Sequence, residues 1–118
     1  MNVVKSIAHW GEERGITEKD FDTNGYISNI VEELGELKES TMHGHWQGQV
    51  DALADIIVFS IVDLMKLQAK PHKVLQECLK EISSRTGAWS DEAEKWLKDT
   101  SPEAKAKWYT ADYSNCRR

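Results

Sequence analysis

A chain of 118 residues with a net charge of −5 is long enough to build one hydrophobic core. The acidic balance argues against a nucleic-acid groove, because no basic stripe offsets it. The longest apolar stretch, residues 56–67, is interrupted by Ser60, Asp63 and Lys66 and is too short and too polar to span a membrane. We therefore expect no nucleic-acid partner and no membrane partner.

The cysteines indicate a reducing compartment. Cys78 lies within a helical pattern, and Cys116 lies close to the C-terminus. Two such cysteines in a sequence without a secretory signal are typical of reduced thiols. We therefore expect a cytoplasmic protein.

Apolar residues recur at helical spacing through most of the chain, and four helices are predicted in order. The first ends at Gly11 or Gly15, where the apolar pattern stops. The fourth takes Pro71 in its first turn and stops at S-S-R-T-G, which supplies Gly87 as a C-cap. The four helices cover about residues 3–10, 23–41, 49–68 and 71–86.

After Trp89 the chain becomes more polar. Two short helical pieces are expected there, one after Ser90 or Asp91 and one beginning at Ser101. No strand pattern is apparent anywhere. The sequence therefore predicts an all-α fold in a single domain of residues 1–118. Its four-helix-bundle core covers about residues 1–87, and its partly helical C-terminal tail covers about residues 88–118.

Two acidic clusters lie within apolar helical sequence. Glu32, Glu33 and Glu36 stand in V-E-E-L-G-E-L, and Asp51 and Asp55 stand in V-D-A-L-A-D-I-I. Spacings of three and four place carboxylates one turn apart on one helical face. Carboxylates that share a low-dielectric region need a counter-charge, so the clusters predict a divalent cation with oxygen ligands. In the alternative interpretation these side chains are simply solvated, as most single glutamates are.

The segment from E-E-L-G-E-L to D-A-L-A-D-I-I-V-F resembles the MazG-like superfamily of all-α nucleoside triphosphate pyrophosphohydrolases, and the tail is similar to small stand-alone and phage members. The family signature is an E-x-x-E pair followed by an E-x-x-D pair. Glu33 and Glu36 match the first pair, Glu32 matches a frequent preceding glutamate, and Asp55 matches the final aspartate.

The second glutamate of the family signature is missing, because Ala52 occupies its position. Asp51 lies one residue earlier and still one helical turn from Asp55. We favour Asp51 as the substitute ligand. The alternative is a site with one ligand fewer, completed by water.

The resemblance implies cleavage of a (d)NTP between its α- and β-phosphates, giving a (d)NMP and pyrophosphate, in housecleaning or regulation of the nucleotide pool. Mg²⁺ is the implied cofactor, with Mn²⁺ as an alternative. The implied metal ligands are Glu33, Glu36, Asp51 and Asp55. Glu32 is either a further ligand or the base that orients the attacking water.

A nucleotide substrate also needs cationic and aromatic partners. Lys80, Ser84, Arg85 and Lys98 are candidates for the phosphates, against the alternative that these polar side chains face solvent. Trp10 and Trp46 are candidate walls for the base, and a plain packing role is equally open for Trp46. His43 and His45 are interpreted as a solvated loop pair rather than a zinc site.

The apolar third helix predicts self-association, since such a stripe would otherwise be exposed. The resemblance implies a homodimer or a homotetramer. Two further hypotheses stay open beside general (d)NTP hydrolysis. One is a specialist dUTPase, dCTPase or phosphoribosyl-ATP pyrophosphohydrolase. The other is a helical binding or regulatory module that has lost turnover with the ligand missing at Ala52.

Overall fold

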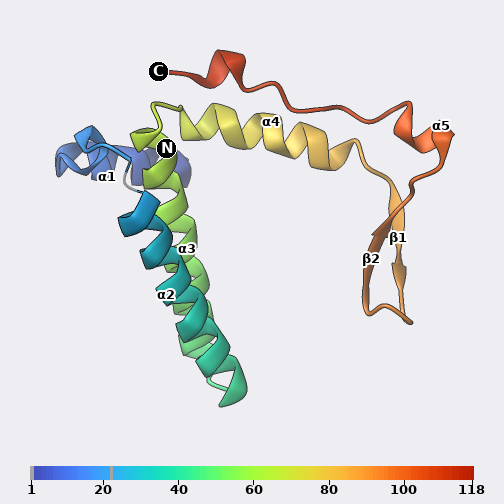
Figure 1. Cartoon of the computed structure of the whole chain (residues 1–118), viewed down its shortest axis with the longest axis horizontal. Helices are drawn as coiled ribbons and strands as arrows, with labels where there is room; N and C mark the ends of the chain where they lie inside the picture. The colour runs from blue at the N-terminus through green and yellow to red at the C-terminus, as the bar shows by residue number, and fades with distance from the viewer. Residues whose placement is uncertain (1, 22) are drawn as a thin grey trace. The chain divides into compact units, whose positions relative to one another are not determined.

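The structure is a computed structural model that describes residues 2–21 and 23–118, with the side chains of residues 23–26 outside the description. It is mostly helical and contains one small two-stranded sheet (Figure 1). The chain forms two compact units, one ending at Pro71 and including Arg118, the other covering His72–Arg117. Each unit is described by itself.

The first unit begins with α1 (Val3–Glu13), which continues through Gly11. The Asn2 side chain caps this helix by accepting a hydrogen bond from the Lys5 amide at 3.0 Å. Gly11 is buried, and a Cβ atom there would lie 3.0 Å from Cγ2 of Thr17. The predicted alternative of an end at Gly11 is therefore wrong: the glycine serves close packing inside the helix. Gly15 (φ 67°) then separates α1 from the 3₁₀ turn η1 (Ile16–Glu18).

Two long helices, α2 (Thr23–Met42) and α3 (Trp46–Lys66), run side by side as an antiparallel hairpin (Figure 1). The turn is tight: the His45 amide donates to the Ser40 carbonyl at 2.8 Å, and Gly44 has φ 62°. A Cβ atom at Gly48 would collide with Oγ of Ser40, so glycine lets the first turn of α3 lie against the end of α2. For this reason α3 starts three residues before the predicted residue 49.

The core of the first unit lies at the C-terminal half of α3. Ile61, Val62 and Met65 are buried there, and this end of α3 packs against α1 and η1. Asp63 and Lys66 are buried one turn apart in the same stretch. Burial raises the pKa of Asp63, and the nearby Lys66 ammonium partly offsets that rise.

The rest of the helical hairpin leaves two apolar stripes exposed. Ile27, Val31 and Leu34 form the stripe on α2, and Val50, Leu53 and Ile57 form the stripe on α3; each of these side chains is at least 45% exposed. Their spacings of three and four residues are those of one helical face. An apolar surface of this kind is typical of helices that are covered by a further element or by another subunit.

The second unit begins with α4 (Pro71–Ser83), which the sequence predicts closely. Its C-terminal part holds the last segment of the chain, residues 109–116, which ends in the 3₁₀ turn η2 (Ser114–Cys116). Oγ of Ser84 accepts a hydrogen bond from the Tyr109 amide at 2.8 Å, and Glu81 accepts one from the Ala111 amide at 3.1 Å. Backbone amides of the tail thus donate hydrogen bonds to side chains at the C-terminal end of α4 and just after it.

Between these parts lies a β-hairpin of β1 (Gly87–Ser90) and β2 (Lys95–Lys98). The predicted helical piece after Ser90 and the predicted absence of strands are therefore wrong. Trp89 faces Trp96 directly across the antiparallel pair, and the Trp96 ring covers Gly87, where a Cβ atom would collide with it. Residues 91–94, D-E-A-E, form the turn of this hairpin instead of the predicted helix.

The short helix α5 (Pro102–Lys105) confirms the second predicted helical piece of the tail. Oγ of Ser101 caps it by accepting a hydrogen bond from the Ala104 amide at 3.2 Å. The mostly helical class is thus confirmed, while the four-helix core and the single domain of residues 1–118 stay predictions. Among the described residues, no helix is long and apolar enough to cross a membrane.

Candidate functional site

The α2–α3 hairpin brings the two acidic clusters to neighbouring helices. Glu32, Glu33 and Glu36 lie in the second half of α2, and Asp51 and Asp55 lie in the first half of α3. Because the helices are antiparallel and adjoin at one turn, carboxylates of both clusters come within electrostatic reach of each other. The sequence spacing alone does not establish this meeting.

Glu33 is the residue on which the clusters converge. Its pKa is raised from 4.5 to about 7, first by desolvation, then by a hydrogen bond with the Glu36 side chain and by repulsion from Glu36, Asp55 and Glu32. Its Oε2 atom is buried and has no hydrogen-bond partner among the described residues. Glu33 therefore occupies a negative, partly dehydrated position that favours either a proton or a cation.

The donor set fits a hard divalent cation. Carboxylate oxygens are the ligands that Mg²⁺ prefers, and the buried Oε2 atom of Glu33 lacks any other partner in the described part of the chain. Within that same part, no group of three or more His, Cys, Asp or Glu side chains lies close enough together to hold a metal ion. Glu33, Glu36 and Asp55 are thus neighbours that would still have to draw together around a cation.

Asp51 occupies a different environment from Asp55. It is exposed and lines an open hollow of about 450 Å³ together with Glu36, His43 and His45. Asp55 is half-buried and raises the pKa of Glu33, whereas Asp51 is not among the groups that do so. The structure therefore brings Asp55 to Glu33 and places Asp51 nearer to the helical turn, beside Glu36.

Ala52 points into the protein: only 2% of its surface is exposed. A longer acidic side chain at this position would lose its solvation or displace neighbouring atoms. The alanine is therefore compatible with tight packing, and a fourth carboxylate would have to come from Asp51 on the exposed side of α3.

The predicted phosphate-binding residues all lie in the second unit. Lys80 pairs with Glu77 at 3.4 Å and lies 5.2 Å above the Tyr109 ring. The Ser84 hydroxyl donates to the Glu81 carbonyl and accepts from the Tyr109 amide, so both of its hydrogen-bonding functions serve the tail. Arg85 and Lys98 instead share a hollow of about 230 Å³.

The two tryptophans predicted as base walls lie in the first unit. Trp46 is the first residue of α3 and is 73% exposed. Trp10 lies near the end of α1, with the Arg14 guanidinium 4.7 Å from its ring centroid. Both rings are accessible enough to contact a ligand, but no contact joins either of them to the carboxylates in the described structure.

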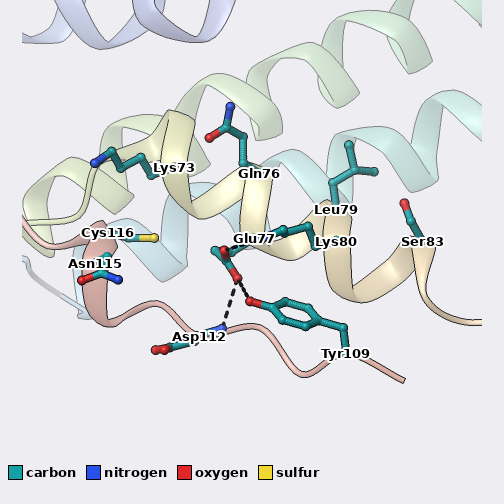
Figure 2. Close-up of a pocket in the computed structure, with 10 residues that line it drawn as sticks. All are labelled: Lys73, Gln76, Glu77, Leu79, Lys80, Ser83, Tyr109, Asp112, Asn115 and Cys116. Atoms are coloured by element: carbon teal, nitrogen blue, oxygen red, sulfur yellow. Dashed lines mark hydrogen bonds and ion pairs between the residues drawn. The ribbon is translucent and has the colours of Figure 1, made fainter. Parts of the chain in front are cut away.

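A hollow of about 610 Å³ lies between α4 and the tail of the second unit (Figure 2). Glu77 stands at its centre and accepts hydrogen bonds from the Tyr109 hydroxyl and from the Asp112 amide, the latter at 3.3 Å. These bonds, led by that of Tyr109, hold the pKa of Glu77 below its usual range. Because its carboxylate is already engaged, Glu77 serves to hold the tail.

Sequence reasoning missed the roles of Glu77 and Tyr109, whereas it predicts a packing role for Trp108 in the tail. The signal was the W-Y pair that closes a polar stretch, since large aromatic residues in such a segment usually pack against a partner. Trp108 stacks on Arg85, with the guanidinium carbon 4.1 Å from the ring centroid. Because Arg85 and Trp108 lie far apart in the sequence, no local pattern predicts this contact.

Comparison of the chain with protein-family models, with curated proteins and with solved structures finds no match. The resemblance of residues 30–59 to the MazG-like superfamily therefore stays a prediction.

Glu33→Gln should stabilise the metal-free protein at a pH above about 7. The pKa of Glu33 in the folded protein lies above the unfolded value of 4.5. The contribution of this carboxyl group to the free energy of unfolding is therefore fully present below pH 4.5 and is lost as the pH rises through about 7. The wild-type free energy of unfolding should therefore fall across that interval, and that of Glu33→Gln should fall less. Urea denaturation at several pH values measures this, with Glu39→Gln on the same helix as control. Parallel curves for Glu33→Gln and wild type would contradict the prediction.

Tyr109→Phe should loosen the tail, because it removes the first of the bonds that hold Glu77 ionised. The pKa of Glu77 is lower in the folded protein than the unfolded value of 4.5. The stabilisation that the Glu77 carboxylate gives to the folded protein is therefore present above pH 4.5 and is lost as the pH falls through the folded pKa. The protection factor of the Asp112 amide against hydrogen exchange should fall in the variant, and in wild type it should fall on acidification. Tyr113→Phe is the matched control. Unchanged protection of Asp112 in Tyr109→Phe would show that the hydroxyl does not secure the tail.

Proposed function

We propose that the protein is a Mg²⁺-dependent nucleoside triphosphate pyrophosphohydrolase of the MazG-like type, which converts a (d)NTP to a (d)NMP and pyrophosphate. The observation that carries the proposal is the position of Glu33, whose buried oxygen lacks a partner while Glu32, Glu36 and Asp55 raise its pKa. A solvated surface glutamate has neither property. The match of Glu33, Glu36 and Asp55 to the family signature is what suggests the chemistry of this negative, cation-favouring position.

Glu33, Glu36 and Asp55 would hold the cation, with Asp51 as the candidate fourth ligand. Mg²⁺ at such a site, or Mn²⁺ in its place, stabilises charge on the phosphate oxygens and lowers the pKa of a bound water. In the hydrolysis, water oxygen bonds to the α-phosphorus, the bond to the bridging oxygen breaks, and pyrophosphate leaves. Glu32 is exposed beside the cluster and is the candidate to accept the proton from the water.

A specialist activity on dUTP, dCTP or phosphoribosyl-ATP uses the same chemistry and differs only in the pocket for the base. A helical binding or regulatory module is the second candidate function, and one observation favours it. Ala52 is buried where the family has a ligand, and Asp51 lies on the exposed side of α3. A site with one carboxylate fewer holds the cation more weakly, which reduces turnover before it reduces nucleotide binding.

The proposed enzyme is a homodimer or a homotetramer in a cytoplasmic setting. The support is the pair of apolar stripes on α2 and α3, which stay exposed within the first unit. Antiparallel helices with such stripes can pack against a second copy about a two-fold axis and bury both stripes at once. The acidic clusters lie on the same two helices, so association would also reduce the access of water to the site.

Incubation with Mg²⁺ and a panel of (d)NTPs should yield a monophosphate and pyrophosphate. Glu36→Gln should lower the rate by at least about 100-fold while leaving the circular dichroism spectrum unchanged. Asp20→Asn, an acid-to-amide change outside the acidic clusters, is the control and should keep full activity. A diphosphate with inorganic phosphate as products would exclude α–β cleavage. Nucleotide binding without turnover, with either Mg²⁺ or Mn²⁺, would favour the binding module.

Asp51→Asn separates the two forms of the metal site. If Asp51 replaces the missing ligand, the variant should need more Mg²⁺ for half-maximal activity, by about tenfold or more. A Mg²⁺ titration of the initial rate measures this, and Asp20→Asn is a control in the same unit. An unchanged titration would mean that Asp51 is not a ligand and that water completes the site.

Ile57→Lys should separate the proposed oligomer into single chains, because it places a charge in the α3 stripe at a side chain that is 57% exposed. Light scattering should give the wild type at least twice the 13.5 kDa of one chain and the variant one chain mass. Met42→Lys, at a 73% exposed position at the end of α2, is the control. A wild type that elutes as a single chain would exclude this association.

A further inference from the structure

The second unit carries a cluster of cations around one aromatic ring. The Arg85 guanidinium carbon lies 4.1 Å from the Trp108 ring centroid, and the ammonium groups of Lys105 and Lys98 lie 5.8 Å and 6.0 Å from it. The three cations come from three places in the chain: Arg85 from the segment just after α4, Lys98 from strand β2 and Lys105 from helix α5 (Figure 1). The fold therefore gathers three positive charges that are far apart in the sequence.

The positive charge of this cluster is not balanced locally. Arg85 has an ion pair with Glu81 at 3.7 Å, but Glu81 also accepts the Ala111 amide. Neither Lys98 nor Lys105 forms an ion pair with any described residue. Attraction of an exposed cation to a ring contributes only about 0.5–1 kcal/mol, which offsets little of the repulsion among three cations. The cluster favours an anion in the same way as the carboxylates around Glu33 favour a cation.

Two buried donors in the cluster also lack acceptors. Nε of Arg85 and Nε1 of Trp108 are both shielded from solvent, and neither has a hydrogen-bond partner in the described part of the chain. Buried N–H groups are normally satisfied, because an unpaired one costs about 1–3 kcal/mol. Both groups are donors only, so a ligand that satisfies them must offer acceptor atoms.

A hollow of about 230 Å³ adjoins the cluster. Arg85 and Lys98 line it together with Glu81, Ile82 and Trp96. Its walls therefore combine two cations with one carboxylate, an indole and an aliphatic side chain, and the carboxylate is already engaged by Arg85 and by the Ala111 amide. The two cations beside the indole suit an anionic group attached to an apolar or flat moiety. A phosphate offers several acceptor oxygens in a compact tetrahedral group, and an arginine fork binds such a group with two parallel hydrogen bonds.

We propose that Arg85, Lys98, Lys105 and Trp108 form a binding site for the polyphosphate group of a nucleotide. The inference rests on the proposed function for the identity of the nucleotide, whereas the affinity for a polyphosphate follows from this cluster alone. It assigns phosphate recognition to Arg85 and Lys98 and adds Lys105 and Trp108. It leaves Ser84 and Lys80 to hold the tail, through their contacts with Tyr109 and Glu77.

Tripolyphosphate without metal tests the site in the full chain. The five tryptophans give five indole N–H signals in a ¹⁵N spectrum, and Trp108→Phe identifies that of Trp108. The Trp108 signal should shift on titration and the Trp46 signal should stay in place. Lys98→Gln and Lys105→Gln should each weaken binding by about tenfold, since each removes one charged partner. Lys95→Gln on the same strand as Lys98 and Lys107→Gln beside α5 are the matched controls.

A Trp108 signal that stays fixed during the titration would overturn the proposal, as would equal weakening by the control variants. Arg85→Lys provides a second check if other changes at Arg85 release the tail: it keeps the charge but loses the fork, so binding should still weaken. The hydrolysis assay is independent of this experiment. A shift of Trp108 in a protein that hydrolyses no nucleotide leaves the anion site standing and removes the proposed activity. Nucleotide hydrolysis together with a fixed Trp108 signal would support the proposed activity and would exclude the anion site at Trp108.

Discussion

The crowding of carboxylates between α2 and α3 is the constraint on which the candidate site depends. Glu33 has lost part of its solvation and faces Glu36, Asp55 and Glu32, so its charged form is disfavoured by both burial and repulsion. A fold selected for stability alone would place an apolar or amide side chain here. The tight turn of the hairpin fixes the register of α2 against α3. This register keeps the carboxylates of the two helices close to each other despite the cost.

The charges of the chain are distributed unequally between the two units. Residues 72–117 contain equal numbers of acidic and basic residues, so the whole net charge of −5 belongs to the remainder of the chain. Within the balanced unit, Glu77 and Glu81 are used to hold the tail, and this leaves the cations at Trp108 without enough acidic partners. The first unit thus carries a cluster with an excess of negative charge, and the second unit carries a cluster with an excess of positive charge.

The apolar stripes give a second reason to regard the first unit as part of a larger arrangement. Ile57 and Val31 are more than half exposed, and the other members of their stripes are at least 45% exposed. Hydrophobic burial is the main favourable contribution to folding, and the two stripes contribute little to it within the first unit, where α1 and η1 pack on the other end of α3. Covering these stripes with a second copy would supply that burial and would enclose the acidic clusters carried by the same helices.

By itself, the amino-acid sequence determined the helices of residues 3–83, the cap of α5 at Ser101 and the one-turn spacing of the carboxylates. These features depend on local periodicity and on capping side chains, which a short window contains. The tertiary structure decided that residues 87–98 form a β-hairpin, in which the backbone pairing of two strands replaces the helix predicted after Ser90. It also decided that Asp55 rather than Asp51 meets Glu33, and that Trp108 meets Arg85. These outcomes depend on contacts between segments distant in the sequence, whose energies no local pattern encodes.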